Sequence, residues 1–402
     1  MKKVPRLVIS LLVSFVAAWF FSCNPSEKKQ DFINANVNFV AEQYGLQTEI
    51  IEKSDEVLNP KSIIDGNIKY IRPQEWTSGF FPGSMWYLYE LTSDEKWKNL
   101  GTKYTEAIEE VKNLTSHHDV GFMIGCSFGN ALRLTENERY KDVIVQAAKS
   151  LSTRFRPDAG VIQSWNVTGG WQAERGWECP VIIDNMMNLE LLFDATKYSG
   201  DSTFYNIAVA HADKTIEHHF RPDYTTWHVI DYSVEDGSVR HKHTAQGFSH
   251  ESTWARGQSW GIYGYVVCYR ETGDTKYLEQ AKKAFEAVAS HVNMPEDKVP
   301  YWDYDAPDIP NALRDASSAA IMASALYELA TYENRDYYKG WADEIMASLA
   351  SPAYRAEVGE NGNFLLKHSV GSIPHNSEID VPLNYADYYF LEALKRKRDL
   401  EK

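Results

Sequence analysis

Apolar residues recur along most of this chain at the spacing of amphipathic helices. Tyr277, Ala281, Phe285 and Val288 lie four, four and three positions apart, so they share one face of a predicted helix. A second pattern is a short polar turn between an apolar helix and an aromatic residue that opens the next helix. It occurs at 91–97, 134–140, 198–204, 271–277 and 332–337. Turns of this kind join antiparallel helices, so the chain is predicted to form helical hairpins.

The remaining connections are long and alternate with the short turns. They run over 66–78, 112–119, 153–181, 220–253, 291–312 and 351–380, and strand-like sequence, such as 226–230, occurs only inside them. With one helix near 31–44 and another near 381–397, the pattern gives about twelve helices, or about six hairpins. It predicts an all-α fold, an (α/α)6 barrel that spans 31–402 as one domain. The long loops then share one rim, where such loops are usually functional.

The first 22 residues have the composition of a secretory signal. In 1–22 a basic start precedes a long apolar stretch, and Cys23 follows directly. This predicts an exported bacterial protein, periplasmic or bound to the outer membrane through lipid on Cys23, with 23–30 as a polar tether. A plain signal peptide or an uncleaved anchor is the alternative. The scattered cysteines show no metal-ligand spacing, and we expect buried free thiols at Cys126, Cys179 and Cys268, with one disulfide as the alternative.

Composition narrows the class of ligand. The formal net charge of −15 argues against binding to nucleic acid, which requires a basic surface. One local Arg or Lys is still enough to hold the carboxylate of a small anionic substrate. The 12 Trp and 24 Tyr residues either fill a large core or line a carbohydrate cleft, where flat rings stack on sugar faces. The sequence has no phosphate-binding glycine loop and no Gly-x-Ser-x-Gly motif.

Two aspartates stand at the predicted entrances to inner helices. Asp184 lies in the apolar run 181–187, where poor solvation raises the pKa of a carboxyl group towards neutrality. Asp119 follows His117 and His118 at another entrance. Two carboxyl groups on one rim are what acid–base chemistry on a sugar requires. Aspartate is also a common helix N-cap, so a purely structural role stays open for both residues.

Arg256 and the histidine pair complete the candidate chemistry. Arg256 lies between Trp254 and Trp260 at a predicted helix start, where a guanidinium can bind a carboxylate through two parallel hydrogen bonds. A structural ion pair is the alternative. Neighbouring residues such as His117 and His118 face apart, and no third ligand is suitably spaced, so we expect no metal site.

Four motifs at these entrances resemble the unsaturated glucuronyl hydrolases, glycoside hydrolase family 88. In chain order they are Trp76-Thr77-Ser78-Gly79-Phe80, His118-Asp119-x-Gly121-Phe122, Ile183-Asp184-x-x-Met187-Asn188 and Ser252-Thr253-Trp254-Ala255-Arg256-Gly257-Gln258. The resemblance covers 66–395 and implies an (α/α)6 barrel with no metal or organic cofactor. It implies that Asp119 and Asp184 are the essential aspartates. The substrate contacts that it implies are Trp76, His118, Gln246, Trp254, Arg256 and Trp260.

The segment 367–376 lies where some relatives hold a sulfate or the second sugar. Its candidates for contact with sulfate are Lys367, Ser369, Ser372 and His375. The alternative is that they belong to a solvated loop. The segment departs from the Ser- and Lys-bearing pattern associated with sulfated chondroitin, so the substrate subtype stays open.

The resemblance also implies the reaction. The substrate would be a lyase-generated glycosaminoglycan oligosaccharide that ends in a 4,5-unsaturated glucuronic acid. Asp184 would protonate C4 of the enol ether, water would add at C5, and ring opening would release the remaining sugar. An unsaturated rhamnogalacturonyl hydrolase acting on pectin fragments is the nearest alternative, although the 252–258 motif favours the glucuronyl family. A sugar epimerase on a related barrel and a non-catalytic, glycan-binding surface lipoprotein are further alternatives.

Overall fold

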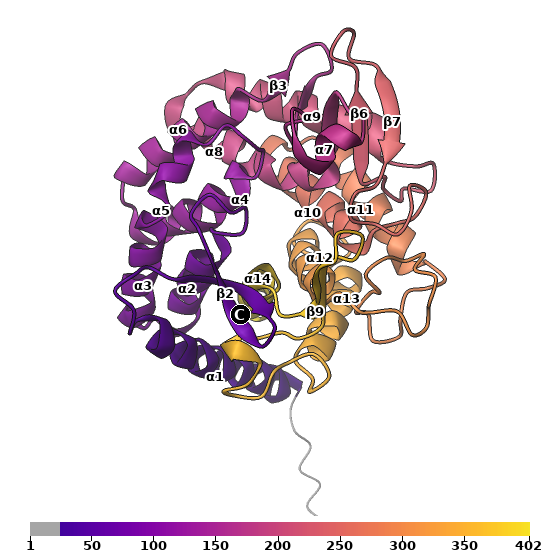
Figure 1. The fold of residues 1–402 in the computed structure, drawn as a ribbon. Coiled ribbons are helices and arrows are strands. Elements are labelled where there is room, and N and C mark those ends of the chain that lie inside the picture. Colours follow the sequence, from indigo (N-terminus) through magenta and orange to yellow (C-terminus); the bar gives the residue numbers. More distant parts are fainter. Residues whose placement is uncertain (1–24) are drawn as a thin grey trace, which may run out of the picture.

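The computed structural model describes residues 25–402, and only the backbone of 25–30. The predicted signal 1–22 and Cys23 lie outside the described residues. Seen along its axis, the chain forms a closed ring of helices (Figure 1). The inner helices are α2 (Phe80–Thr92), α4 (Val120–Ile124) continued by η2 (Gly125–Gly129) and α5 (Asn130–Thr135), α8 (Leu189–Ser199), α10 (Ala255–Thr272), α12 (Ala316–Leu329) and α14 (Asn384–Glu401). The outer helices are α1 (Pro25–Ile51), α3 (Glu95–Glu106), α6 (Arg139–Ser152), α9 (Ser202–His219), α11 (Thr275–Ala289) and α13 (Arg335–Leu349).

This arrangement confirms the predicted all-α (α/α)6 barrel. The inner and outer helices differ in how they are buried. In α12, every residue except Glu328 is buried, because inner helices are covered by neighbours on all sides. In α11, Tyr277, Ala281, Phe285 and Val288 are buried, which confirms the face that the spacing predicted. Helix α1 begins at Pro25, inside the segment that the sequence predicted as a tether.

Three of the five short turns, those before α3, α9 and α11, use an aspartate to cap the helix that follows. Helices α8 and α10 end at Gly200 and Gly273, whose φ angles of 74° and 69° favour glycine. The carboxylates of Asp94, Asp201 and Asp274 then accept a backbone N–H at the start of α3, α9 and α11. Because such turns reverse the chain within a few residues, they hold the paired helices antiparallel and gather at one end of the barrel.

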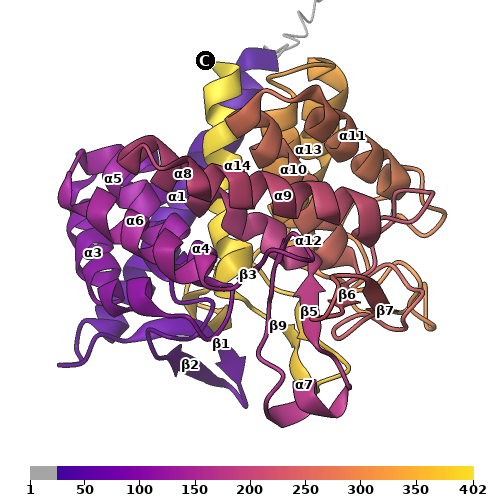
Figure 2. The same cartoon turned by 90° about the horizontal axis from the view of Figure 1, so that it is seen from above.

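The long connections gather at the other end, as predicted (Figure 2). They carry all the strands of the described residues, each paired antiparallel with its neighbour. The pairs are β1 (Asn59–Ile64) with β2 (Asn67–Ile71), β3 (Phe155–Arg156) with β4 (Val161–Ile162), and β8 (Ser369–Ser372) with β9 (Ser377–Val381); β5 (Cys179–Ile182), β6 (Val229–Tyr232) and β7 (Val239–His243) form one sheet. The short helix α7 (Gly170–Glu174) also lies here. The first connection is longer than the predicted 66–78, since β1 belongs to it.

Two further observations concern the cysteine thiols and the apolar character of the helices. Cys126, Cys179 and Cys268 are buried and free, as predicted. Within residues 25–402, no helix combines the length and the apolar character that a bilayer crossing requires.

Candidate active site

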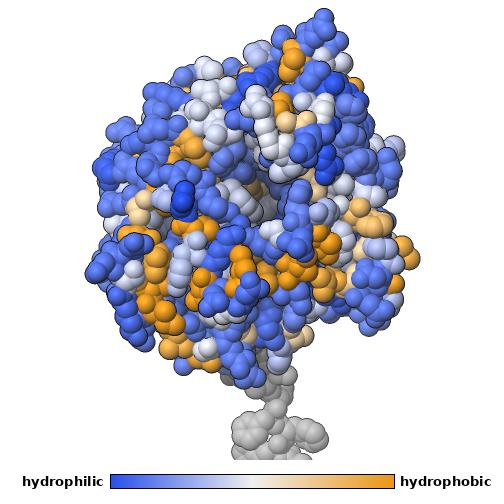
Figure 3. Space-filling view, viewed as in Figure 1, coloured by the Kyte–Doolittle hydropathy of each residue, from blue (hydrophilic) through white to orange (hydrophobic). Residues whose placement is uncertain are grey.

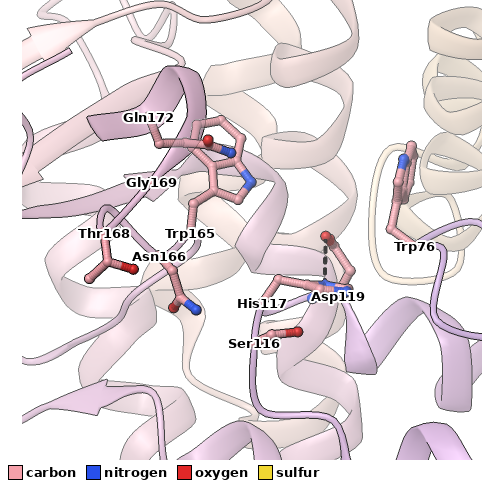
Figure 4. Close-up of a pocket in the computed structure, with 9 residues that line it drawn as sticks. All are labelled: Trp76, Ser116, His117, Asp119, Trp165, Asn166, Thr168, Gly169 and Gln172. Carbon is pink, nitrogen blue, oxygen red and sulfur yellow. Dashed lines mark hydrogen bonds and ion pairs between the residues drawn. The ribbon is translucent and has the colours of Figure 1, made fainter. Parts of the chain in front are cut away.

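A cleft opens at the rim that carries the long connections, in the hollow at the centre of the face shown in Figure 3. It consists of three adjoining cavities of about 480, 340 and 100 Å³, and Trp76 and Trp165 belong to the wall of each. In the outermost cavity, these two indoles stand on opposite sides of the carboxylate of Asp119 (Figure 4). The innermost cavity contains both Asp119 and Asp184. The structure therefore brings the two predicted aspartates into one aromatic-walled cleft.

Asp119 is held between two histidines. It stands at the N-cap position of α4, but its side chain caps nothing. Its Oδ1 lies 3.3 Å from Nε2 of His118, and its Oδ2 lies 3.4 Å from Nδ1 of His117. Burial by itself raises the pKa of Asp119, but His118, His117 and Arg154 outweigh burial and leave the pKa below its ordinary value. Asp119 is therefore ionised at neutral pH.

Asp184 has the opposite electrostatics. It is the second residue of η3 (Ile183–Asn188), where Ile182 takes the N-cap position, so the N-cap alternative does not describe it. Burial is the main cause that raises the pKa of Asp184 to about 7; Arg256 lowers this pKa, and the charge of Asp119 adds to the rise. A carboxyl group with this pKa holds its proton in a substantial fraction of molecules at neutral pH and is suited to donate it. One ionised and one protonated carboxyl group thus face the same cavity.

Asn188 connects the segment that carries Asp119 with the segment that carries Asp184. Its side-chain oxygen accepts the backbone N–H of Phe122 at 3.0 Å, and its Nδ2 lies 3.5 Å from Nδ1 of His118. A Cβ atom on Gly121 would lie 2.4 Å from that oxygen, so only glycine permits this approach of α4 to η3. The motifs at 118–122 and 183–188 are far apart in sequence, but their residues meet in one contact between α4 and η3.

Arg256 is more fully engaged than the sequence indicated. Its buried guanidinium donates to Oδ2 of Asp315 at 3.0 Å, to the carbonyl of Gly371 at 2.6 Å and to the carbonyl of Val370. The ring of Trp254 packs against it at 4.5 Å. The structural ion pair that we left open is therefore present and uses part of the five N–H groups of the guanidinium. Because Arg256 also lines both inner cavities, contact with a substrate carboxylate stays a prediction.

Of the other predicted substrate contacts, one lines the cleft and two lie behind its wall. Gln246 lines both inner cavities and donates to the carbonyl of Gly371 at 3.2 Å. Trp254 and Trp260 are buried and lie outside the described walls of the three cavities. Trp260 packs against the ring of Phe122 and interacts with Asp184, where it acts to lower the pKa of that carboxyl group. These two indoles support the floor of the cleft from behind.

The candidate sulfate contacts are separated by the structure. Ser372 and His375 line the cleft, and Oγ of Ser372 lies 2.7 Å from Nδ1 of His375. Lys367 instead donates to the carbonyl of Pro352 at 2.8 Å, and Ser369 is fully buried. Neither belongs to the described walls of the cleft. The reason is local: His368, between them, has a φ of 61°, and this turn directs the two side chains away.

Several site residues escaped the sequence analysis. Trp165 packs within 6.0 Å of both Trp171 and Trp177, and together they form an aromatic group in the long connection 153–181. The density of Trp in that loop was the available signal. His228 has no comparable signal, because its position beside Asp184 arises only from the fold.

The floor of the cleft carries unsatisfied polar atoms. Among the described residues, the following buried atoms there have no hydrogen-bond partner: Nε2 of His118, Oδ2 of Asp184, Nε2 of His228, Nε1 of Trp260 and Oη of Tyr385. Buried polar groups are normally paired, and of these five residues Asp184 and Tyr385 line the cleft, where a polar ligand would meet them. Within residues 25–402, no group of three or more His, Cys, Asp and Glu side chains is placed to hold a metal ion.

Comparisons with known proteins agree with this geometry. An unsaturated glucuronyl hydrolase from Formosa agariphila is 43% identical over all of this chain and 99% of its own length. An unsaturated chondroitin disaccharide hydrolase from Streptococcus agalactiae is 32% identical over 80% of this chain and 81% of its own length. A crystal structure of an unsaturated glucuronyl hydrolase specific for heparin is 41% identical, with a TM-score of 0.87 over 92% of this chain and 98% of that chain. The model of Glycosyl Hydrolase Family 88 matches residues 50–398, and the chain belongs to this family of unsaturated glucuronyl hydrolases.

Proposed function

We propose that the chain removes the 4,5-unsaturated glucuronic acid from the non-reducing end of lyase-generated glycosaminoglycan oligosaccharides by hydrating the C4=C5 enol ether. One observation carries the proposal: Asp184, with a pKa raised to about 7 by burial, shares a small cavity with an ionised Asp119. Protonation of carbon requires a carboxyl group that still holds its proton near neutral pH.

The reaction begins at the double bond. Asp184 gives its proton to C4, the π electrons form the new C4–H bond, and positive charge develops at C5, shared with the ring oxygen. Water adds at C5 and returns a proton to the carboxylate of Asp184, which restores the acid. The resulting hemiketal opens as the bond between C5 and the ring oxygen breaks. C5 becomes a ketone, and the ring oxygen becomes a hydroxyl on C1. That hemiacetal expels the remaining sugar and leaves an aldehyde at C1, so one water is consumed.

Asp119 and the aromatic walls have supporting roles in this scheme. The negative charge of Asp119 favours the protonated form of Asp184 and stabilises the positive charge that forms on the sugar ring. Its carboxylate also accepts hydrogen bonds from sugar hydroxyls. Trp76, in the wall of all three cavities, offers a flat face for the unsaturated ring.

Solvent labelling tests the route. Hydration in deuterated water places deuterium at C4, and hydration in heavy-oxygen water brings the label first to C5, with the ring oxygen becoming the aldehyde oxygen. Direct glycoside hydrolysis brings the oxygen label to C1, and deuterium reaches C4 only later, when the released enol tautomerises in solution without the enzyme. Products are trapped quickly and analysed by NMR and mass spectrometry, because carbonyl exchange blurs the oxygen label. Early label at C1 without deuterium at C4 overturns the mechanism.

We propose a heparin-derived disaccharide without sulfate on its second sugar as the preferred substrate. The relative specific for heparin supports this assignment. The second support is electrostatic. In the cavity lined by Ser372, Lys61 lies 2.6 Å from both Glu75 and Glu378, so two carboxylates surround one cation. Lys367, the predicted cation for sulfate, is bonded elsewhere. Both carboxylates therefore compete with a sulfate for Lys61.

A panel of disaccharides tests this preference. Lyase products of heparin, hyaluronan, chondroitin and pectin, with and without sulfate, are compared by the loss of double-bond absorbance. Unsulfated heparin disaccharide should have the highest kcat/KM, and Glu378→Gln should raise the relative rate on sulfated substrates severalfold. Fastest turnover of a sulfated chondroitin or a pectin disaccharide contradicts the preference.

We also propose that the protein is exported and anchored through lipid on Cys23, which lies outside the described residues. The start of α1 lies at the barrel end opposite the long connections (Figure 2). An anchor before α1 therefore leaves the cleft facing away from the membrane, open to oligosaccharides.

A further inference from the structure

His228 lies beside the proposed acid, and its ring has a defined orientation. It directly precedes β6, and its Nδ1 accepts the backbone N–H groups of Ala245 and Gln246 at 3.1 and 3.2 Å. The hydroxyl of Thr244 lies 3.4 Å from the same nitrogen. A nitrogen that accepts two N–H groups carries no proton, so a neutral ring must carry its hydrogen on Nε2.

The ring is also neutral and packed by aromatic neighbours. His228 is buried, and burial holds its pKa well below the usual range. The charged or titratable groups that face it, Arg256, His219, His375 and His118, disfavour its protonation further. The ring of Trp254 packs against it at 4.5 Å, and the ring of Trp165 meets it edge-on at 6.3 Å. These ring contacts and the N–H groups that Nδ1 accepts favour one orientation of the ring, with Nε2 on the side of Asp184.

Nε2 of His228 lies near the carboxyl group of Asp184. Nε2 lies 3.6 Å from Oδ2 of Asp184, and both atoms are buried without a hydrogen-bond partner among the described residues. This distance is longer than a hydrogen bond, so the contact requires the carboxyl group to move closer to Nε2. Nε2 of His228 carries the ring hydrogen, so it is the donor of this pair and Oδ2 of Asp184 is the acceptor.

We propose that His228 is a positioning residue that receives Oδ2 of Asp184 and thereby keeps the transferable proton on Oδ1, the oxygen left to face the substrate. The proposal rests on the role of Asp184 as the acid. Asp184 lines the innermost cavity while its Oδ2 is buried, which leaves Oδ1 for C4. After proton transfer, Nε2–H stabilises the new carboxylate, because donors to an ionised acceptor bind more strongly.

A similar pairing occurs at Asp119. Nδ2 of Asn188 lies 3.5 Å from Nδ1 of His118, and Nε2 of His118 lies 3.3 Å from Oδ1 of Asp119. Burial lowers the pKa of His118 to about 4, so this ring is also neutral. Each carboxyl group thus faces the Nε2 atom of a buried neutral imidazole whose other nitrogen meets an N–H donor.

Two substitutions test the roles of the two ring nitrogens of His228 separately. In His228→Asn, the amide oxygen replaces Nδ1 and keeps the contact with 245–246, but the donor to Asp184 is lost. In His228→Gln, the longer side chain carries an amide N–H to the position of Nε2. We expect His228→Asn to stay folded with a wild-type KM, to lose kcat on the order of tenfold to a hundredfold, and to move the alkaline limb of the kcat profile to higher pH. His228→Gln should recover kcat severalfold over His228→Asn.

His219→Asn is the matched control. His219 is another buried histidine of low pKa, but its Nε2 contacts the carbonyl of Val181 at 3.1 Å rather than a carboxyl group. We expect this variant to lose stability without moving the pH profile. A profile that moves equally in His219→Asn and His228→Asn overturns the proposal, as does a His228→Gln variant with no recovery of kcat.

Nitrogen NMR of the labelled wild-type enzyme needs no variant to fold. The His228 signals should show a neutral ring with hydrogen on Nε2 between about pH 5 and 8, and Nε2 should shift as Asp184 ionises. Hydrogen on Nδ1 or an Nε2 signal insensitive to pH overturns the proposal. Full activity in Asp184→Asn refutes the proposed acid itself. An inactive Asp184→Asn together with a wild-type profile in His228→Asn refutes only the role of His228.

Discussion

Asp184→Asn removes a catalytic candidate whose ionisation in the folded state is strongly opposed by its surroundings. The pKa of Asp184 rises from 3.8 to about 7 on burial, and its side chain is 11% exposed. Below the unfolded pKa, the carboxyl group is protonated in both states and has no effect on stability through ionisation. As the pH rises, the unfolded chain releases the proton first, so unfolding becomes progressively more favourable until the folded pKa is reached.

The magnitude follows from the shift. At about 1.36 kcal/mol per pKa unit, ionisation of Asp184 costs the folded state about 4 kcal/mol above pH 7. Asparagine has a similar shape and does not ionise. The stability of Asp184→Asn relative to wild type should therefore rise by about 4 kcal/mol between pH 4 and pH 7 and stay constant above that range.

Urea unfolding at a series of pH values measures this difference, and turnover is measured in parallel. Loss of the proton donor should lower kcat/KM at least about a hundredfold in a folded protein. Asp119→Asn is the control of opposite sign, because the pKa of Asp119 is lowered and its ionised form stabilises the fold above the unfolded pKa. A stability difference for Asp184→Asn that does not change with pH refutes the buried-acid argument, and wild-type turnover refutes the catalytic one.

Three further predictions concern the guanidinium of Arg256, the contact between α4 and η3, and the N-terminus. Arg256→Lys should lower kcat/KM at least about tenfold, because lysine reproduces neither the planar donor pair nor the contact with Asp315; unchanged kinetics and unchanged binding of uronides exclude a carboxylate contact. Gly121→Ala should lower the free energy of unfolding by about 1–3 kcal/mol in denaturant titrations, since its Cβ would overlap Asn188; wild-type stability means that α4 moves freely. Mass spectrometry should find a lipidated N-terminus at Cys23, and Cys23→Ala should abolish membrane partitioning; an unmodified N-terminus elsewhere contradicts the anchor.

The sequence by itself determined the barrel. Periodicity in 277–288 describes one helix face, and the repeated short turns describe hairpins, because both depend on contacts within a few residues. The apolar neighbours of Asp184 likewise predicted its raised pKa, since burial of the surrounding run is itself a local property. The four motifs are sufficient to identify the helix entrances that carry Asp119 and Asp184.

Tertiary structure decided how the side chains are used. Arg256 meets Asp315 and Gly371, which lie 59 and 115 residues away, and no periodicity specifies a contact between such distant elements. Lys367 faces away from the cleft because the irregular backbone beside it turns, a feature that hydrophobic pattern does not encode. His228 acquires its tautomer and its contact with Asp184 only when β6 and the loop at 244–246 close around it. Helix faces follow from local spacing, whereas the partners of a buried polar side chain depend on which distant loops the fold brings together.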